Sequence, residues 1–450
     1  MKDKPKNVIW IFGDQHRSQA LGIHGDPNLF TPNIDNLARS GVDFSNALMG
    51  TPLCCPCRGS LLTGLYPHEC VPGHEYPLPE NCQSRTIACA LKEHGYETAW
   101  FGKWHLDGFK ERNGRGALHP IPRERRGGFD TWIGYENNNS QYDSWVQGHK
   151  ADGTEIPLYR LPGYETDSLT EILIDFLKMK AGEAAQGESK PFFAGLSVQP
   201  PHDPYLAPEA FSRIRNPAGI QLRLNVPPID RIIRQAQKDL AGYYSMIENI
   251  DWNVGRIRQV LKETGLEEST YILFFSDHGD LHGCHGQFRK TSPLEESIRV
   301  PFIIGGGTPF YGHHSGVSPA LVNHVDVAPT TLGLCGLGKA PWMRGCDFSG
   351  YYRPDRPRVV TPDSAFLQSV VPTLHHDSVD HAWRGIVSDD GWKFVCLEGQ
   401  PWLLHDLNED PYELVNHAFN TRYRNKQVEL LNRLQKWITD TGDSFRLPKL

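Results

Sequence analysis

The chain has 450 residues, 39% of them hydrophobic and 22% charged, a composition typical of a globular protein with room for one large domain and a smaller one. Its formal net charge of -7 argues against general binding to nucleic acid or to anionic membranes. A negatively charged substrate would therefore have to be attracted by a local pocket.

The ten cysteines follow no spacing typical of a disulfide framework, so most of them are expected to be buried thiols. The apolar run over residues 8–12 is too short for a signal-peptide core or a transmembrane helix, and no other stretch approaches membrane length. As written, the sequence predicts neither a signal peptide nor a transmembrane segment. A chain whose export signal had been removed would look the same, so the compartment stays open.

Residues 7–13 predict a buried parallel strand that ends at Asp14 and Gln15. Ligands of open α/β sheets bind at the carboxyl ends of the strands, and a carboxylate beside an amide oxygen suits a divalent cation. Capping of a following helix is the alternative interpretation of Asp14. The helix predicted over residues 31–38 is interpreted as structural.

Residues 54–64 read Cys-Cys-Pro-Cys-Arg-Gly-Ser-Leu-Leu-Thr-Gly. Pro56 suits the first turn of a helix, which places Cys54 at or just before the helix N-terminus, where free N–H groups favour a bound anion. Cys54 and Cys57 also have the spacing of a thioredoxin-like redox motif, so a redox interpretation stays open.

A predicted strand over residues 97–101 leads into Gly-Lys-Trp-His-Leu at residues 102–106. In an extended chain Lys103 and His105 would share one face, where a cation and an imidazole suit the binding of an anion and the transfer of its proton. Residues 107–165 predict long loops, which are either binding loops or ordinary surface. Their aromatic residues could stack on sugars or belong to the core: Trp132, Tyr135, Tyr142 and Trp145.

Two further apolar strands, over residues 191–198 and 271–275, also end in polar residues. His202 follows a double proline after the first of them, and Ser-Asp-His-Gly, with Asp277 and His278, follows the second. Lys290 comes soon after. The long helical pattern over residues 229–265 is expected to serve core packing and not chemistry.

From about residue 353, short alternating runs and a closing helix over residues 425–439 predict a smaller unit of sheet and helix. We expect a catalytic domain over residues 1–352 and an α+β subdomain over residues 353–450. Residues 402–413 are expected to dock the second unit on the first.

Three motifs, Cys-x-Pro-x-Arg with Leu-Thr-Gly, Gly-Lys-Trp-His-Leu and Ser-Asp-His-Gly, resemble those of the sulfatase family in the alkaline phosphatase superfamily. The resemblance implies an α/β fold, with a large, mixed and mostly parallel sheet between helices and a smaller C-terminal antiparallel subdomain. Cys57 stands where the family usually has serine. Gln15 stands where many members have aspartate, a variant shared with phosphonate and phosphodiester hydrolases.

The resemblance implies that a formylglycine-generating or radical maturation enzyme oxidises Cys54 to formylglycine. One hydroxyl of the hydrated aldehyde would attack sulfur, and the other would expel sulfate as the aldehyde re-forms. The implied ligands of one divalent cation are Asp14, Gln15, Cys54, Asp277 and His278. Oxygen ligands favour calcium, and the imidazole leaves manganese or magnesium open.

The resemblance also implies roles for the remaining polar residues. Arg58 would orient the nucleophile, and Lys103, Lys290 and His202 would neutralise the sulfuryl and leaving oxygens. His105 would take the proton of the second hydroxyl, and either His202 or Lys290 would protonate the leaving group.

The sequence thus predicts a sulfuric ester hydrolase acting on a small sulfated substrate, a mono- or oligosaccharide. Three alternatives stay open: a phosphonate monoester or phosphodiester hydrolase, a thiol redox protein using Cys54 and Cys57, and a non-catalytic glycan-binding relative whose Cys54 is never converted. The sugar, the position of its sulfate and the oligomeric state are not readable from the sequence.

Overall fold

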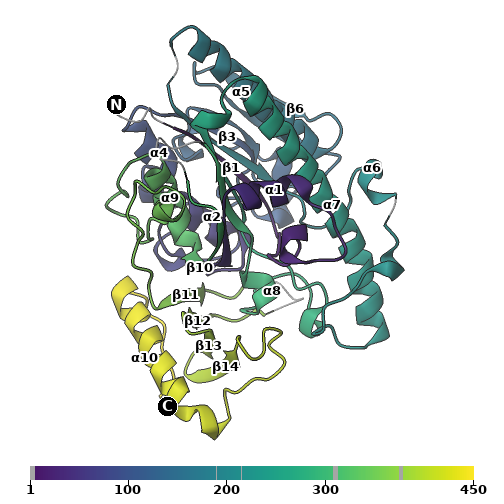
Figure 1. Cartoon of the computed structure of the whole chain (residues 1–450), viewed down its shortest axis with the longest axis vertical. Helices are drawn as coiled ribbons and strands as arrows, with labels where there is room; N and C mark the ends of the chain where they lie inside the picture. Colours follow the sequence, from purple (N-terminus) through teal and green to yellow (C-terminus); the bar gives the residue numbers. More distant parts are fainter. Residues whose placement is uncertain (1–5, 189, 214, 308–312, 374–378, 450) are drawn as a thin grey trace.

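A ten-stranded mixed sheet runs through the larger part of the molecule, and a four-stranded antiparallel sheet lies beside it near the carboxyl terminus (Figure 1). The computed structural model describes residues 6–188, 190–213, 215–307, 313–373 and 379–449. This architecture confirms the predicted fold class. Among the described helices, none is both long and apolar enough to cross a bilayer.

The large sheet owes its mixed character to the strands at its two sides. Across it the strands follow the order β10 (Gly316–Asn323), β2 (Val42–Leu48), β9 (Phe302–Gly306), β8 (Thr270–Ser276), β1 (Asn7–Gly13), β7 (Phe192–Val198), β3 (Glu97–Lys103), β4 (Thr131–Tyr135), β5 (Trp145–His149) and β6 (Glu155–Arg160). The central strands β8, β1, β7, β3 and β4 are parallel to one another, whereas β9, β5 and β6 pair antiparallel. The carboxyl ends of the central strands therefore meet at one edge of the sheet.

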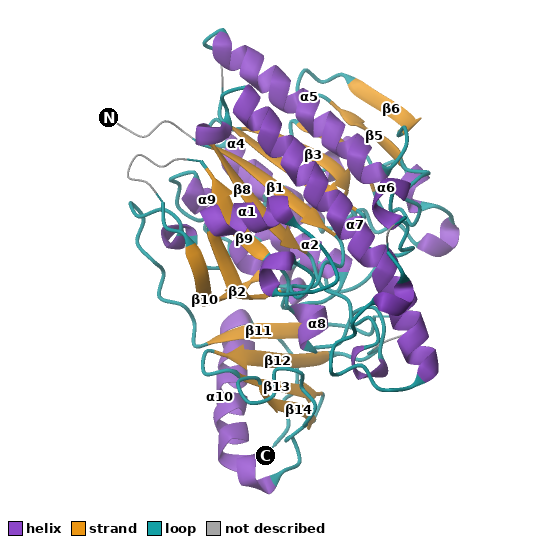
Figure 2. Ribbon diagram, turned by 45° about the vertical axis from the view of Figure 1, so that its right-hand side comes forward, coloured by secondary structure: helices purple, strands orange, loops and turns teal. Residues whose placement is uncertain are grey.

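Side chains alternate between the two faces of β1, and both faces are covered by helices (Figure 2). Trp10 and Phe12 pack in one apolar cluster, whereas Ile9 and Ile11 pack in the other. The first cluster includes residues of α2 (Cys54–Thr63), α4 (Ile87–Lys92) and α9 (Val327–Leu334). The second includes residues of α1 (Pro32–Ser40), α5 (Glu165–Ala185) and α7 (Asp230–Glu263). Short helices α3 (Glu80–Gln83), α6 (Glu209–Ser212) and α8 (Glu295–Ile298) lie in the connections.

The region expected to form loops, residues 107–165, contains three strands, β4 to β6, that extend the sheet. Each is five or six residues long, and β4 is buried along its whole length, so the sequence shows no alternation of polar and apolar residues there. Trp132 and Tyr135 of β4 are core residues and not sugar-stacking candidates. Tyr142 is 44% exposed and Trp145 is half-buried.

The small sheet packs against the closing helix α10 (Arg424–Thr441). Its strands are β11 (Ser364–Ser369), β12 (Trp383–Ser388), β13 (Trp392–Leu397) and β14 (Gln400–Asp406). Lys393 of β13 contacts Glu295 of α8 and Glu413, each at 2.7 Å. Glu413 also accepts the backbone N–H of Glu295, in agreement with a docking role for residues 402–413. The domain boundary at residue 352 stays a prediction.

Replacing Lys393 with methionine should destabilise the protein by about 3–5 kcal/mol, because the fully buried Glu295 and Glu413 would lose their shared cation. Chemical unfolding of wild type and variant would measure this difference. Lys436→Met is the matched control, since Lys436 pairs with Asp440 in an exposed i,i+4 pair, and its unfolding midpoint should not move. Equal effects of the two substitutions would contradict the docking role of Lys393.

Candidate active site

Polar residues from the carboxyl ends of four central strands converge on the first residue of α2. Asp14 follows β1, Lys103 ends β3, His202 comes after β7, and Asp277 follows β8. The register places these ends together, since Gly13 pairs with both Val198 and Ser276. Because the strands are buried on both faces, the core surrounds the site, and the structure brings together these residues from separate strand ends.

Helix α2 begins at Cys54 and ends with Gly64 in the left-handed conformation at a φ of 69°, as the Pro56 and Leu-Thr-Gly signals predict. The Cys54 Sγ lies 3.1 Å from His278 Nε2, 3.1 Å from Lys290 Nζ and 3.5 Å from Asp14 Oδ1. Burial and Asp14 raise the pKa of the Cys54 thiol, but Lys290, Lys103 and His278 outweigh them and leave this pKa below its ordinary value.

Cys57 has different surroundings. It packs in the apolar cluster around Trp10, and burial raises the pKa of its thiol well above the ordinary value. All ten cysteines of the chain are free thiols in this structure. The geometry therefore favours a function of Cys54 alone over a redox pair of Cys54 and Cys57.

Four side chains at the site have the donor atoms and the spacing for one divalent cation. The ligand atoms of Asp14, Cys54, Asp277 and His278 all lie within 4.8 Å of one another. His278 Nδ1 lies 3.0 Å from the Gly279 carbonyl oxygen, which leaves Nε2 facing Cys54 and Asp14. Two carboxylates, one imidazole and the residue at position 54 fit a cation with mixed oxygen and nitrogen ligands.

Gln15, the fifth predicted ligand, contacts the other members of the site in this structure. Its backbone N–H donates to Asp277 Oδ1 at 3.1 Å, and its amide oxygen accepts a hydrogen bond from Lys290 Nζ at 3.0 Å. Its amide nitrogen donates to Asp280 Oδ2 at 2.5 Å. Coordination of a cation by Gln15 stays a prediction.

Three buried cations surround the carboxylates and Cys54. Arg58 donates through Nε to Asp277 Oδ2 at 2.9 Å and through Nη2 to Asp14 Oδ2 at 3.3 Å. Lys103 donates to the same Asp14 oxygen at 2.6 Å. Burial alone would raise the pKa of Asp14, but Lys103 and the neighbouring cations hold this pKa well below its usual range. Lys290, the third cation, lies 2.9 Å from His202 Nε2.

Two histidines of the site are neutral at neutral pH. Burial and the Lys290 ammonium lower the pKa of His202 to about 4. Burial and Lys103 lower the pKa of His105 well below its ordinary value of 6.5. His105 has a φ of 58°, so the chain turns there and the prediction of an extended Lys103–His105 segment is wrong. The His105 ring instead packs edge-on against His74, with ring centroids 5.5 Å apart, and its buried Nδ1 has no partner among the described residues.

Sequence reasoning missed a second group of residues that supports the first. Tyr205 donates its hydroxyl to Asp280 Oδ2 at 2.6 Å, and Arg289 donates to the Tyr205 oxygen at 2.6 Å. Ser197 accepts a hydrogen bond from Arg58 Nη1 at 2.8 Å. Asp280, close behind Ser-Asp-His-Gly, could have been found from its position. Tyr205 and Arg289 lie outside helices and strands, and Ser197 lies within an apolar strand, so no pattern marks them.

Comparison with known proteins gives a consistent result along the chain. The family model described as Sulfatase matches residues 6–337, and one described as N-sulphoglucosamine sulphohydrolase, C-terminal, matches residues 283–440. The chain is 32% identical to an ulvan-active sulfatase of Formosa agariphila, over 99% of this chain and 84% of that protein.

Solved structures share the fold over nearly the whole chain. One from Bacteroides thetaiotaomicron, described in connection with the metabolism of multiple glycosaminoglycans, has a TM-score of 0.82 at 25% identity and covers 98% of this chain and 97% of that chain. A phosphonate monoester hydrolase of Agrobacterium radiobacter has a TM-score of 0.73 at 23% identity, with coverage of 97% and 96%. The latter likeness shows a common fold only.

The ligand group predicts that a divalent cation stabilises the protein. Calcium added to chelator-treated protein at a hundredfold excess over its Kd should raise the free energy of unfolding by about 2.7 kcal/mol. Thermal melts with and without cation would measure the shift. His278→Ala should remove most of it, whereas His324→Ala, at an equally buried histidine outside the ligand group, should retain it. If added cation stabilised His278→Ala as much as it stabilises the wild type, this assignment would be contradicted.

Proposed function

The chain belongs to the sulfatase family, and from this premise we propose that it removes sulfate from a carbohydrate, with residue 54, matured to formylglycine, as the nucleophile. It is a sulfuric ester hydrolase, as the family match over residues 6–337 indicates. The observation that carries the rest of the proposal is the position of the Cys54 side chain, which faces Asp14, His278 and Lys290 at the start of α2.

The surroundings of residue 54 suit an oxygen nucleophile better than a thiol. A formylglycine there would supply a hydrated aldehyde, with one hydroxyl to attack sulfur and a second to expel sulfate. Lys290 lies within hydrogen-bond reach of this position and would stabilise an ionised hydroxyl. Arg58, held by Asp14 and Asp277, would keep the carboxylates in place beside it.

Asp14, Asp277 and His278 would hold the divalent cation together with residue 54, and Gln15 would complete the set. A cation there would lower the pKa of the nucleophilic hydroxyl and offset charge on the sulfate. The carboxylate and amide oxygens favour calcium, and the imidazole of His278 keeps manganese and magnesium as alternatives.

The remaining site residues would act on the sulfate group and its protons. Lys103 and Lys290 are buried cations that would stabilise the negative oxygens of the transition state, each by about 3 kcal/mol. His105 is neutral and would take a proton from residue 54. His202, also neutral, and Lys290, which lies 2.9 Å from it, are the two groups from which the leaving oxygen would receive its proton.

A carbohydrate substrate is supported by the relatives and by the rim of the site. The relative from Formosa agariphila is described as ulvan-active, and the structure from Bacteroides thetaiotaomicron is described with glycosaminoglycan metabolism. Tyr142 is 44% exposed, and it follows Gln141, which donates to the His202 carbonyl oxygen at 3.1 Å. An exposed aromatic ring on this loop would be suited to stacking on a sugar.

Relative kcat/KM on an aryl sulfate and an aryl phosphonate, with protein converted at residue 54, tests this function against the phosphonate hydrolase alternative. The sulfate should be the preferred substrate, and Cys54→Ala should abolish its turnover. Cys57→Ser, which introduces the family's usual residue, should retain turnover because its hydroxyl can bond the Leu53 carbonyl within the helix. A preference for phosphonate, or activity lost only in Cys57→Ser, would contradict the proposal.

The low pKa of His105 predicts where activity falls with acidification. A general base works unprotonated, and burial with Lys103 holds its pKa below 6.5, so kcat/KM should stay constant from pH 7.5 to 6.5 and fall only below it. His105→Ala should lower kcat by about 10²–10⁴. His94→Ala, at an exposed histidine that follows α4, serves as the control. An unchanged kcat in His105→Ala, or an acid limb above pH 6.5 that is lost in His105→Ala, would contradict this assignment.

A further inference from the structure

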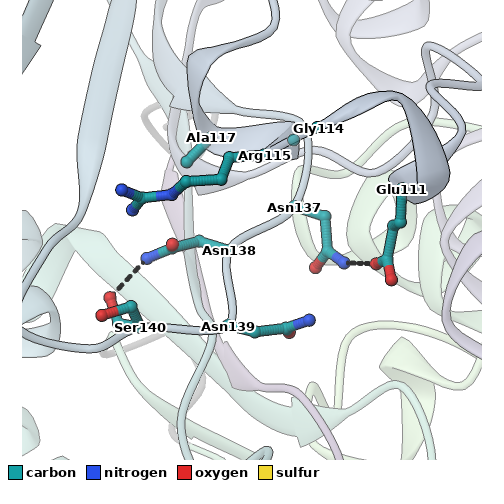
Figure 3. Close-up of a pocket in the computed structure, with 9 residues that line it drawn as sticks. Glu111, Gly114, Arg115, Ala117, Asn137, Asn138, Asn139 and Ser140 are labelled. Carbon is teal, nitrogen blue, oxygen red and sulfur yellow. Dashed lines mark hydrogen bonds between the residues drawn. The ribbon is translucent and has the colours of Figure 1, made fainter.

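A polar pocket of about 320 Å³ lies beside the candidate active site, and the mechanism above does not use it. Figure 3 shows its lining side chains, among them Glu111, Arg115, Asn137, Asn138, Asn139 and Ser140. The asparagines follow β4, which pairs in parallel with β3, and Lys103 pairs with Tyr135. The pocket therefore lies at the same edge of the sheet as Lys103 and His105.

Two chains of contacts join the pocket to the active site. On one side the Glu111 N–H donates to Glu75 Oε1 at 2.8 Å, and the same oxygen lies 3.9 Å from His74 Nε2, whose ring packs against His105. On the other side the loop that carries the asparagines continues to Gln141, which binds the His202 carbonyl oxygen. A substrate extending from the site between His105 and His202 would reach this pocket.

The pocket offers hydrogen-bond acceptors, and the side-chain donors of Asn137, Asn138 and Arg115 are engaged. The Asn137 amide nitrogen donates to Glu111, but Asn137 Oδ1 has no partner among the described residues, although the residue is only 7% exposed (Figure 3). Such a buried acceptor is costly without a donor. The Asn138 amide nitrogen donates to Ser140 O at 2.7 Å and Ser144 Oγ at 2.8 Å.

The charges of the pocket disfavour a second anion. Arg115, the cation in the lining, is turned towards Asp143: its Nη1 donates to Asp143 Oδ2 at 2.6 Å and its Nη2 to the Asp143 backbone oxygen at 2.8 Å. Asp143 also pairs with Arg160, whose Nε donates to Asp143 Oδ1 at 2.8 Å. Glu111 is exposed, and the carboxylate of Glu75 lies next to it. A carboxylate or sulfate on the ligand would therefore meet negative charge here.

We infer that this pocket is a subsite for an uncharged, hydroxyl-bearing sugar unit linked to the sulfated one, an inference that rests on the proposed function. Hydroxyl donors of the sugar would satisfy Asn137 Oδ1 and the Glu111 carboxylate. A volume of about 320 Å³ is at the lower end of ligand pockets, about 300–1,000 Å³, which suits one sugar ring. The substrate would then be at least a disaccharide with a neutral neighbour unit.

Three sulfated sugars test the inference with converted protein: the sulfated monosaccharide that is turned over fastest, its disaccharide with a neutral hexose, and its disaccharide with a hexuronate. The kcat/KM for the neutral disaccharide should be about tenfold above that for the monosaccharide, which is the gain expected from one or two added hydrogen bonds. The disaccharide with a hexuronate should show no such gain. Equal values for monosaccharide and neutral disaccharide, or a preference for the hexuronate, would overturn the subsite.

Two variants separate a binding role from a structural one. Asn137→Ala should lower the ratio of kcat/KM for the neutral disaccharide to kcat/KM for the monosaccharide about fivefold to tenfold. Glu111→Gln keeps an oxygen for the Asn137 amide but removes the charge, so discrimination against the hexuronate should fall about threefold to tenfold. Asn420→Ala, which removes a helix cap in the C-terminal unit, should leave both ratios unchanged. Unaltered ratios in Asn137→Ala and Glu111→Gln would overturn the subsite.

The two proposals fail in different ways. If converted protein hydrolyses sulfated monosaccharides but shows no dependence on the neighbouring unit, the subsite is wrong and the proposed function stands. If converted protein hydrolyses no sulfate ester of any kind, the proposed function is wrong, and the subsite inference that rests on it is overturned as well.

Discussion

The structure of the site depends on the sharing of one buried carboxylate. Asp14 places one oxygen against Lys103 and Arg58 and turns the other towards Cys54 and His278. With Lys290, three cations are buried around two carboxylates, those of Asp14 and Asp277. Buried charge without compensation is costly, so the site is electrostatically suited to an added anion, such as an ionised nucleophile or a sulfate group. A bound cation would strengthen this requirement.

The fold holds these buried charged residues in fixed positions. Parallel strands buried on both faces hold the ends of β1, β3, β7 and β8 in a fixed register, and α2 enters the same edge with its N-terminus. Arg58 is tied to strand ends at four points, including Ser197 and the Lys103 carbonyl oxygen, so its orientation does not depend on a bound substrate. Preorganised cations of this kind stabilise a transition state without reorganisation at the moment of reaction.

Much of the central architecture was predictable, since long apolar runs bounded by polar residues mark β1, β7 and β8, and Pro56 marks the start of α2. The convergence of Asp14, Asp277 and His278 followed from parallel topology. The short strands β4 to β6 were not predictable, because β4 is buried on both faces and β6 is largely exposed, so neither shows alternation. The left-handed turn at His105 and the contacts of Asp280 with Tyr205 depend on tertiary packing that no local pattern encodes.

In the proposed mechanism Cys54, alone among three neighbouring cysteines, becomes the nucleophile. Tandem mass spectrometry of the peptide that contains residues 54–58, on protein produced with a maturation enzyme and assayed in parallel for sulfate release, tests it most directly. We expect an aldehyde or its hydrate at residue 54, unmodified thiols at Cys55 and Cys57, and turnover in proportion to the converted fraction. Full sulfate release by protein whose Cys54 is still a thiol would contradict this mechanism.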